Sequence, residues 1–300
     1  MEKTFLLGVG AQKSGTTWVY RYLQGHPECA LGRIKEMASL ATLFDETGPL
    51  DREEAKLETL QKVSAKMVLR MRLDKVTDES LTELSDKIQH VAADYDWSSY
   101  LQYYAGQFEQ KPASKLTADL TPEYGLMSEQ ALARAKNELE KAGYRVKVLF
   151  LMREPVERCY SALRMAYRRG LKAGRPMLEM PDVNFATDAI QPWVYERTRY
   201  EKILPKIESV FAPQDRYIAF FETFFNAQSV QNLCEFLGIA FVPINFGKRV
   251  NTSPRIVEPS AVEWSQVQTF YQETYKYCAA KFGADLISDL WGYDAKSMLS

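Results

Sequence analysis

The stretch FLLGVGAQKSGTTWVYRYLQG, residues 5–25, constrains the fold more than any other part of the sequence. Residues 5–10 form a short apolar run that ends in glycines, which is typical of a buried strand. Residues 16–24 then carry apolar side chains at helical spacing, and Gly25 and Pro27 end that pattern. A strand, a glycine-rich loop and a helix in this order predict a loop whose backbone N–H groups face an anion.

Further strands and helices alternate along the chain. The clearest buried strand is YRVKVLFLM, residues 144–152, and Pro155 suits the first turn of a helix that continues to about residue 169. The other predicted elements are strands at 115–120 and 217–221, helices at 128–141, 195–211 and 228–237, a loop at 242–259, and two C-terminal helices. This alternation predicts an α/β fold with a central, mainly parallel sheet flanked by helices.

Two segments of this predicted sheet carry groups that attract anions. In parallel sheets, ligands bind at the carboxyl ends of the strands. The glycine loop follows the first strand, and Arg153 follows the strand at 144–152. A guanidinium close to a helix N-terminus is suited to bidentate contact with a phosphate. We therefore expect the loop and Arg153 to lie at the same edge of the sheet.

Composition limits the partners and the compartment. With 300 residues, 46% of them hydrophobic, the chain can bury a large core. Its formal net charge of −1 does not favour binding to nucleic acid or to anionic lipid. The four cysteines lie far apart and form no CxxC pair, which suits a reducing compartment. No run approaches the ~18 apolar residues of a membrane span, and the N-terminal run is too short for a signal peptide, so we expect a cytoplasmic protein without a membrane span.

The glycine loop departs from two common templates. The dinucleotide fingerprint GxGxxG requires glycine at position 13, where this chain has Lys13. The Walker A motif GxxxxGK[ST] aligns with Gly10 and Gly15 but requires lysine at position 16, which is Thr16. The lysine has moved to the middle of the loop. An alternative interpretation is an ordinary turn in which Ser14 or Thr16 caps the helix.

A second segment, VLFLMREPVERCYSALRM at residues 148–165, also carries groups suited to binding an anion. Two such segments favour an anion site over an ordinary turn. Arg153 leaves the strand, and Ser161 lies in the second turn of the following helix. Arg158 stands one turn after Glu154, and this spacing is also typical of an ion pair on a helix surface.

Both segments resemble elements of one enzyme superfamily. GAQKSGTT, residues 10–17, resembles the 5′-phosphosulfate loop of sulfotransferases that use 3′-phosphoadenosine 5′-phosphosulfate (PAPS). REPVERCYS, residues 153–161, is similar to the 3′-phosphate element RxPxxRxYS of the same superfamily. Shorter segments resemble its heparan-sulfate-type and bacterial branches: His26-Pro27, Lys35-Glu36 and Thr121-Pro122-Glu123-Tyr124. The resemblance covers about residues 5–255.

The resemblance implies a P-loop-like three-layer fold and a transfer of a sulfuryl group from PAPS to a hydroxyl or amine. The product would be adenosine 3′,5′-bisphosphate, and no metal would be required. The acceptor would be a small molecule or a carbohydrate. We expect a single domain over residues 1–300, with a helical insertion at about 50–110 that recognises the acceptor or acts as a lid. Assembly into a homo-oligomer is left open.

The resemblance also assigns roles to residues. Lys13 would stabilise charge on the bridging oxygen, and Glu36 would act as the base, with Lys35 orienting the sulfonate. The alternative interpretation of Lys35-Glu36 is a solvated ion pair in a loop. The residues expected to bind the donor are Gln12, Lys13, Ser14, Gly15, Thr16, Thr17, Arg153 and Ser161. Lys248 and Arg249 would close over the 3′-phosphate, or else belong to a solvated basic loop.

Other polar residues leave alternatives open. His90 is either a surface or half-buried residue or an alternative base, whereas the His26 turn favours a structural role. Asp119 would bind acceptor or cap a turn. The aromatic residues Tyr95, Trp97, Tyr100, Tyr103 and Tyr104 have a spacing that favours core packing over a stacking platform for the acceptor.

Two other functions compete with sulfuryl transfer. A metal-dependent P-loop kinase acting on a small molecule is disfavoured by Thr16, which stands where Walker A requires lysine. A non-catalytic nucleotide-binding module would bind the bisphosphate without transferring a group to any acceptor.

Overall fold

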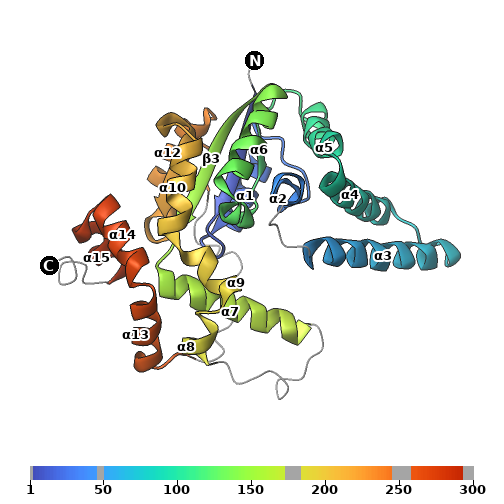
Figure 1. Cartoon of the computed structure of the whole chain (residues 1–300). Coiled ribbons are helices and arrows are strands. Elements are labelled where there is room, and N and C mark those ends of the chain that lie inside the picture. Colours follow the sequence, from blue (N-terminus) through green and yellow to red (C-terminus); the bar gives the residue numbers. More distant parts are fainter. Residues whose placement is uncertain (1–2, 46–50, 173–183, 245–257, 293–300) are drawn as a thin grey trace.

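The computed structural model describes residues 3–45, 51–172, 184–244 and 258–292. Within these ranges four strands form one all-parallel sheet in the order β2-β1-β3-β4. Figure 1 shows β3 with helices on both sides of it. The strands are β1 (Lys3–Gly10), β2 (Leu116–Asp119), β3 (Tyr144–Met152) and β4 (Arg216–Phe220). This sheet, flanked by helices, confirms the predicted α/β fold.

Helices cover both faces of the sheet. In β3, Val148 and Phe150 join the hydrophobic cluster of one face, while Leu149 and Leu151 join that of the other. The first face packs against α6 (Glu129–Lys141) and α10 (Tyr200–Val210), and the second against α1 (Thr16–Gly25) and α12 (Ala227–Leu237). Because neither face meets water, β1 and β3 are apolar along most of their length, as expected for parallel strands.

The register brings the carboxyl ends of the strands together. Leu7 of β1 pairs with Asp119 of β2 and with Val148 of β3, and Met152 of β3 pairs with Phe220 of β4. The segments that follow these strands therefore begin at one edge of the sheet, as the topology rule predicts.

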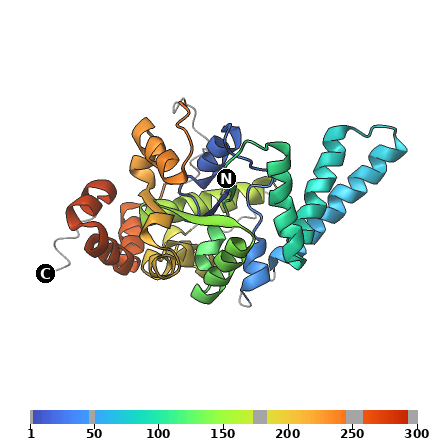
Figure 2. The same ribbon diagram turned by 90° about the horizontal axis from the view of Figure 1, so that it is seen from above.

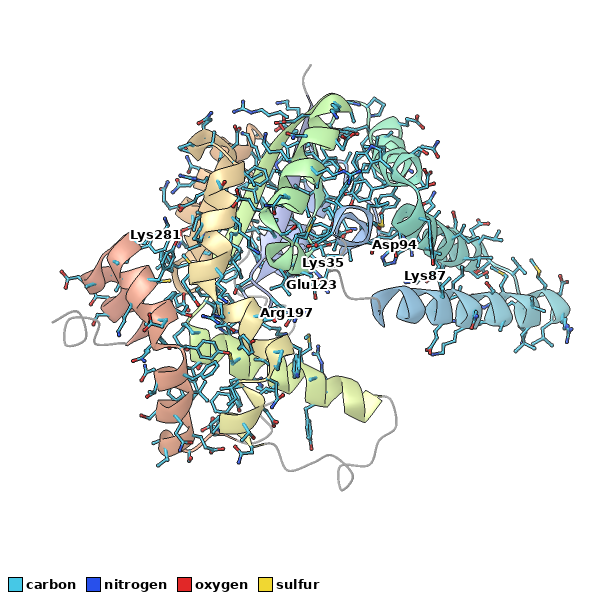
Figure 3. The ribbon with its side chains drawn as sticks, viewed as in Figure 1. Lys35, Lys87, Asp94, Glu123, Arg197 and Lys281 are labelled. Atoms are coloured by element: carbon cyan, nitrogen blue, oxygen red, sulfur yellow. The ribbon has the colours of Figure 1, made fainter. Side chains whose placement is uncertain are left out.

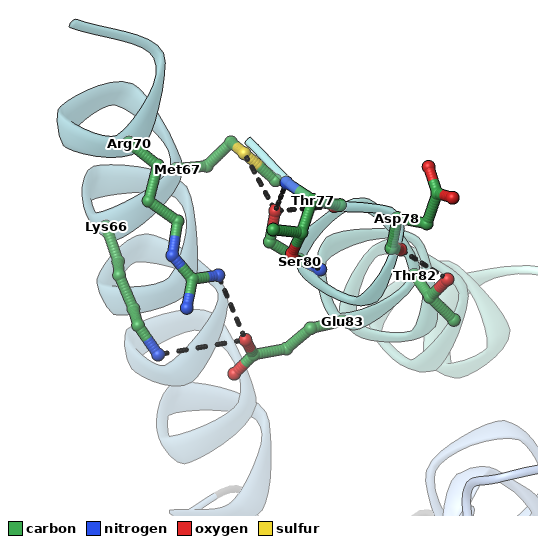
Figure 4. Close-up of polar contacts among 8 residues, drawn as sticks. All are labelled: Lys66, Met67, Arg70, Thr77, Asp78, Ser80, Thr82 and Glu83. Atoms are coloured by element: carbon green, nitrogen blue, oxygen red, sulfur yellow. Dashed lines mark hydrogen bonds and ion pairs between the residues drawn. The ribbon is translucent and has the colours of Figure 1, made fainter. Parts of the chain in front are cut away.

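The predicted helical stretch consists of α3 (Asp51–Arg72), α4 (Asp78–Tyr95) and α5 (Trp97–Gln110). Figure 2 shows α3 and α4 side by side, extending away from the sheet. Figure 4 shows how this pair is joined: Glu83 Oε2 lies 3.8 Å from both Lys66 Nζ and Arg70 Nη1. The side chains of Thr77 and Ser80 form a capping box at the start of α4. A capping box thus marks the start of α4, and weak exposed ion pairs join the two helices of this projecting hairpin.

Helix α5 supports the sheet with its tyrosines. Tyr100, Tyr103 and Tyr104 are each at most 4% exposed, and the Tyr104 ring lies 4.7 Å from that of Phe5 in β1. These three residues confirm the core-packing interpretation of the aromatic cluster. Tyr95, in contrast, is 58% exposed.

Two helix predictions were wrong in their boundaries. The single helix predicted at 195–211 is instead α9 (Pro192–Tyr195), the 3₁₀ turn η3 (Glu196–Thr198) and α10. The break occurs because contacts from α7 (Pro155–Lys172) hold the turn: Arg158 Nη2 donates to the Val194 carbonyl at 2.7 Å. The two predicted C-terminal helices are three: α13 (Ala261–Phe270), α14 (Gln272–Phe282) and α15 (Ala284–Trp291). Gly283, with φ of 104°, separates the last two.

The remaining short elements connect these layers. They are α2 (Ser39–Phe44), η1 (Pro122–Leu126), α8 (Phe185–Asp188), η4 (Pro213–Asp215) and α11 (Phe221–Phe224). Among the described residues, no helix combines the length and apolar character needed to cross a membrane. Most of the loop predicted at 242–259 lies outside the described residues.

Candidate active site

The loop after β1 has an unusual backbone. Lys13 and Gly15 adopt positive φ angles of 73° and 90°, and Gly15 is the N-cap of α1 without any side-chain cap. A Cβ atom at Gly15 would lie 2.4 Å from Phe225 Cζ, so only glycine fits there. The alternative in which Ser14 or Thr16 caps the helix is therefore wrong.

The start of α1 leaves polar groups directed at the loop. The first N–H groups of a helix have no intrahelical partner, and here Thr16 and Thr17 begin the helix. Ser14 is completely buried, and its Oγ has no hydrogen-bond partner among the described residues. A buried hydroxyl without a partner is costly unless a ligand satisfies it. The loop thus has the features of an anion cradle.

Arg153 contacts this loop directly. Its Nη1 donates to the Lys13 carbonyl at 3.3 Å, and its Nη2 donates to Glu157 Oε2 at 2.8 Å. The guanidinium also lies 4.5 Å from the centre of the Phe221 ring. The two motifs, 140 positions apart in the sequence, are therefore in contact at one edge of the sheet. Ser161, farther along α7, is half-buried.

Arg158 and Glu154 do not form the surface ion pair that their spacing allows. Arg158 is completely buried, and Glu154 is 7% exposed. Arg158 donates to the Val194 carbonyl, while Glu154 accepts hydrogen bonds from the backbone N–H groups of Val156 and Glu157. Tertiary packing of α7 against residues 192–198 buries this side of the helix and replaces the local pairing.

Lys35 and Glu36 form an ion pair with each other, and their side chains are 19% and 45% exposed. The residue that follows is fixed from two sides. The Met37 carbonyl lies 2.9 Å from His90 Nε2, and the Met37 N–H donates to Asp119. His90, the alternative base, therefore contacts the backbone directly after Glu36. The carboxylate of Glu36 is partly exposed, and the backbone of the next residue is held by these two contacts.

Asp119 is the centre of a buried polar network. It is completely buried and accepts hydrogen bonds from Tyr100 Oη at 3.0 Å, Tyr124 Oη at 2.6 Å and Thr121 Oγ1 at 2.6 Å. Burial raises the pKa of its carboxyl group, and these donors oppose the shift. Asp119 thus holds the segment after β2 and the Met37 backbone, and it does not face solvent.

Replacing Asp119 with alanine is expected to lower the free energy of unfolding by about 3 kcal/mol, because several buried donors lose their acceptor. Urea denaturation measures this loss. The matched control is Asp96→Ala, which removes an exposed N-cap of α5 that accepts the N–H groups of Ser98 and Ser99. We expect the control to lose much less stability, and equal losses would contradict the assigned role of Asp119.

A further polar contact, not predicted from the sequence, joins the loop to the β2 side. Gln12 Nε2 donates to Glu123 Oε1 at 3.5 Å, and Arg197 Nη2 lies 3.9 Å from the same oxygen. Figure 3 shows Glu123 and Arg197 close to each other near the centre of the molecule. Glu123 belongs to η1 and Arg197 to η3. The resemblance includes Glu123 only as part of the TPEY segment and gives it no role, and Arg197 lies in the stretch predicted as a helix at 195–211.

The other candidate residues divide into two groups. His26 is buried, with Nε2 2.8 Å from the Ala240 carbonyl and Nδ1 accepting the Glu28 N–H, which agrees with a structural role. Lys248 and Arg249 lie outside the described residues. Within the described ranges, no group of three His, Cys, Asp or Glu residues is arranged to hold a metal ion.

The fold and this edge define an α/β protein in which a glycine-rich loop and an arginine from the neighbouring strand meet at the carboxyl end of a parallel sheet. The model of the Sulfotransferase family matches residues 6–243. The chain belongs to this family, and it is therefore a sulfotransferase family enzyme.

Solved structures agree with this fold. A sulfotransferase from Alicyclobacillus acidocaldarius is 19% identical with a TM-score of 0.57, over 93% of this chain and 96% of that one. The sulfotransferase domain of the Synechococcus PCC 7002 olefin synthase is 19% identical with a TM-score of 0.51, over 91% and 94%. No curated protein sequence matches the chain significantly. These likenesses support the fold, and the heparan-sulfate-type branch stays a prediction.

Proposed function

We propose that the protein transfers a sulfuryl group from PAPS to a hydroxyl or amine acceptor and releases adenosine 3′,5′-bisphosphate. The observation that carries this proposal is the 3.3 Å contact between Arg153 Nη1 and the Lys13 carbonyl. PAPS has anionic groups at its 5′ and 3′ positions, so it requires two anion-binding segments within reach of each other. The contact supports such a pair.

The residues of this edge fit the donor. The buried hydroxyl of Ser14 lacks a partner among the described residues, and the N-terminus of α1 favours an anion. We assign the 5′-phosphosulfate to the loop residues, which are Gln12, Lys13, Ser14, Gly15, Thr16 and Thr17. Arg153 and Ser161 would hold the 3′-phosphate. When bound, PAPS supplies the activated sulfuryl group.

Lys13 and Glu36 would carry the chemistry. A sulfuryl group has less negative charge than a terminal phosphoryl group, so one lysine can stabilise the charge on the bridging oxygen without a metal ion. Glu36 would accept the proton of the acceptor as the acceptor attacks in line. The contacts of Met37 with Asp119 and His90 support a fixed position for Glu36.

The acceptor side is proposed from the position of the helical insertion. The helices of residues 51–110 contact the chain next to Lys35-Glu36, because His90 of α4 lies within hydrogen-bond distance of the Met37 carbonyl. We assign acceptor recognition to this helical insertion, with a small molecule or a carbohydrate as acceptor. The expected compartment is the cytoplasm.

The proposal is tested by ligand-dependent melting of the wild type and of Arg153→Ala. Adenosine 3′,5′-bisphosphate should stabilise the wild type by about 2.7 kcal/mol at a hundredfold excess over its Kd. ATP, with or without Mg²⁺, should stabilise it less. Arg153→Ala should lose the preference for the bisphosphate over ATP, because the 3′-phosphate loses its bidentate partner.

Two outcomes would favour the competing functions. Preferential stabilisation by ATP with Mg²⁺, together with ATP turnover, would favour the kinase. Binding of the bisphosphate without a mass gain of one SO₃ on any acceptor in a screen with labelled donor would favour a non-catalytic module.

A further inference from the structure

Helix α14 reaches back to the segment that carries Arg153. This helix lies beyond residues 6–243, which the family model matches. Figure 1 shows α13, α14 and α15 together at the end of the chain, beside α10 and α7. Tyr275 of α14 is completely buried, and its hydroxyl donates a hydrogen bond to Glu154 Oε1. Glu154 directly follows Arg153.

The carboxylate of Glu154 fixes the start of α7. It accepts the N–H groups of Val156 at 3.2 Å and Glu157 at 2.5 Å, which are among the first N–H groups of the helix. The N–H of Glu154 itself donates to Glu222 Oε1 at 2.8 Å. The acceptor oxygens of Glu154 are thus occupied by two N–H groups and one hydroxyl.

The backbone of Arg153 is held as well. Tyr200 Oη donates to the Arg153 carbonyl at 2.8 Å and accepts the Arg153 N–H at 3.2 Å. The direction of the guanidinium therefore depends on a turn whose backbone is fixed by α10, α11 and α7. Tyr275 adds the only contact among these that comes from the described C-terminal helices.

We propose that Tyr275 is a positioning residue for the donor: it holds the Glu154 carboxylate at the start of α7, and Glu154 in turn directs Arg153 towards the 3′-phosphate. The proposal rests on the proposed function, because it takes the bisphosphate as the ligand of Arg153. It extends that function to a helix outside the family match.

The chemistry of Glu154 gives the proposal a pH dependence. Burial raises the pKa of Glu154 to about 7, and the Tyr275 hydroxyl and the two N–H groups oppose this shift. The other charged groups near this turn are Arg153, the buried Arg158 and the carboxylates of Glu157 and Glu222. Only the ionised carboxylate accepts all three donors, so bisphosphate affinity should fall as the pH falls through about 7. The Tyr275 hydroxyl lowers the pKa of Glu154, so loss of this hydroxyl should move the fall in affinity to higher pH.

The test compares Tyr275→Phe, Glu154→Gln and a control, Tyr271→Phe. Tyr271 is also buried, but its hydroxyl donates to the Ala189 carbonyl and accepts from Cys159, so it makes none of the described contacts with the Arg153 turn. Titration calorimetry gives the Kd of adenosine 3′,5′-bisphosphate between pH 6 and 8.5. Tyr275→Phe should bind about tenfold more weakly at pH 7.5, since a hydrogen bond to a charged group is lost. Tyr271→Phe should stay within about twofold of the wild type.

The pH profile separates positioning from a general loss of structure. In Tyr275→Phe the fall in affinity should begin at higher pH than in the wild type. In Glu154→Gln the transition near pH 7 should disappear, leaving only the titration of the ligand phosphates near pH ~6. Unchanged affinity and profile in Tyr275→Phe, or equal weakening in Tyr271→Phe, would overturn the proposal.

A measurement without ligand keeps the two proposals apart. Hydrogen exchange of the amides of Val156 and Glu157 should be about tenfold faster in Tyr275→Phe than in Tyr271→Phe, because Glu154 accepts from both amides. If the wild type fails to bind the bisphosphate, the proposed function fails, and the exchange rates still decide the role of Tyr275. Equal exchange in both variants would contradict that role.

Discussion

Lys13→Met should lower kcat about 10²–10³-fold while the protein stays folded, which is the cost of removing one preorganised group that stabilises transition-state charge. Methionine keeps an unbranched side chain of similar length and lacks the ammonium group. Lys13 lies in the middle of the loop, and its carbonyl accepts a hydrogen bond from Arg153, a contact that the substitution leaves in place. Steady-state kinetics with labelled PAPS and the acceptor found in the screen measure the effect.

Binding of adenosine 3′,5′-bisphosphate provides the control for Lys13. This product lacks the sulfuryl group, so Lys13→Met should weaken its binding far less than it lowers kcat. A fall in kcat of less than tenfold would rule out Lys13 as the residue that stabilises the bridging oxygen. Equal losses in kcat and in bisphosphate binding would indicate that Lys13 only binds the donor.

Glu36→Gln should lower kcat about 10²–10⁴-fold, the usual contribution of a general base. Glutamine preserves the shape of the side chain but cannot accept the proton of the acceptor. Hydrogen bonds with Asp119 and His90 hold the backbone of Met37, the next residue. The substitution should therefore leave the position of the Lys35-Glu36 segment unchanged. The measurement is kcat at saturating PAPS and acceptor.

Glu28→Gln is the matched control for Glu36. Glu28 is also partly exposed and paired with a lysine, Lys115, but it accepts the Ala240 N–H on another part of the surface. The kcat of the Glu28→Gln variant should stay within about twofold of the wild-type value. If Glu36→Gln keeps full activity and His90→Ala loses it, the base is His90.

Much of the fold could be predicted because its signals are local. The strand predicted at 144–152 coincides with β3, and the helix predicted at 228–237 corresponds to α12, whose C-cap is Gly238 with φ of 73°. Both have strong apolar patterns and defined ends. The prediction of one helix at 195–211 was wrong, because a 3₁₀ turn interrupts it. Arg158, from a distant part of the chain, donates to the Val194 carbonyl next to that turn.

In the candidate site, too, some contacts could be predicted from the sequence and others could not. The contact of Arg153 with the loop could be predicted, since each segment follows a parallel strand and such strands end at one edge. The partners of Asp119 could not, because Tyr100 and Tyr124 approach it from α5 and η1. Its sequence context allowed a turn cap or an acceptor ligand equally well.

The sequence by itself determined the order of the strands and of the helices between them up to residue 172, the glycine-rich loop with its central lysine, and the meeting of that loop with Arg153 at one edge. These follow from apolar periodicity, the conformational freedom of glycine and the geometry of parallel strands, all of which act locally or by a simple rule. Only the tertiary structure decided that Arg158 is buried, that Asp119 anchors Met37 and that Tyr275 holds Glu154. Such hydrogen bonds join residues far apart in the chain, and they depend on how helices pack, which no local pattern specifies.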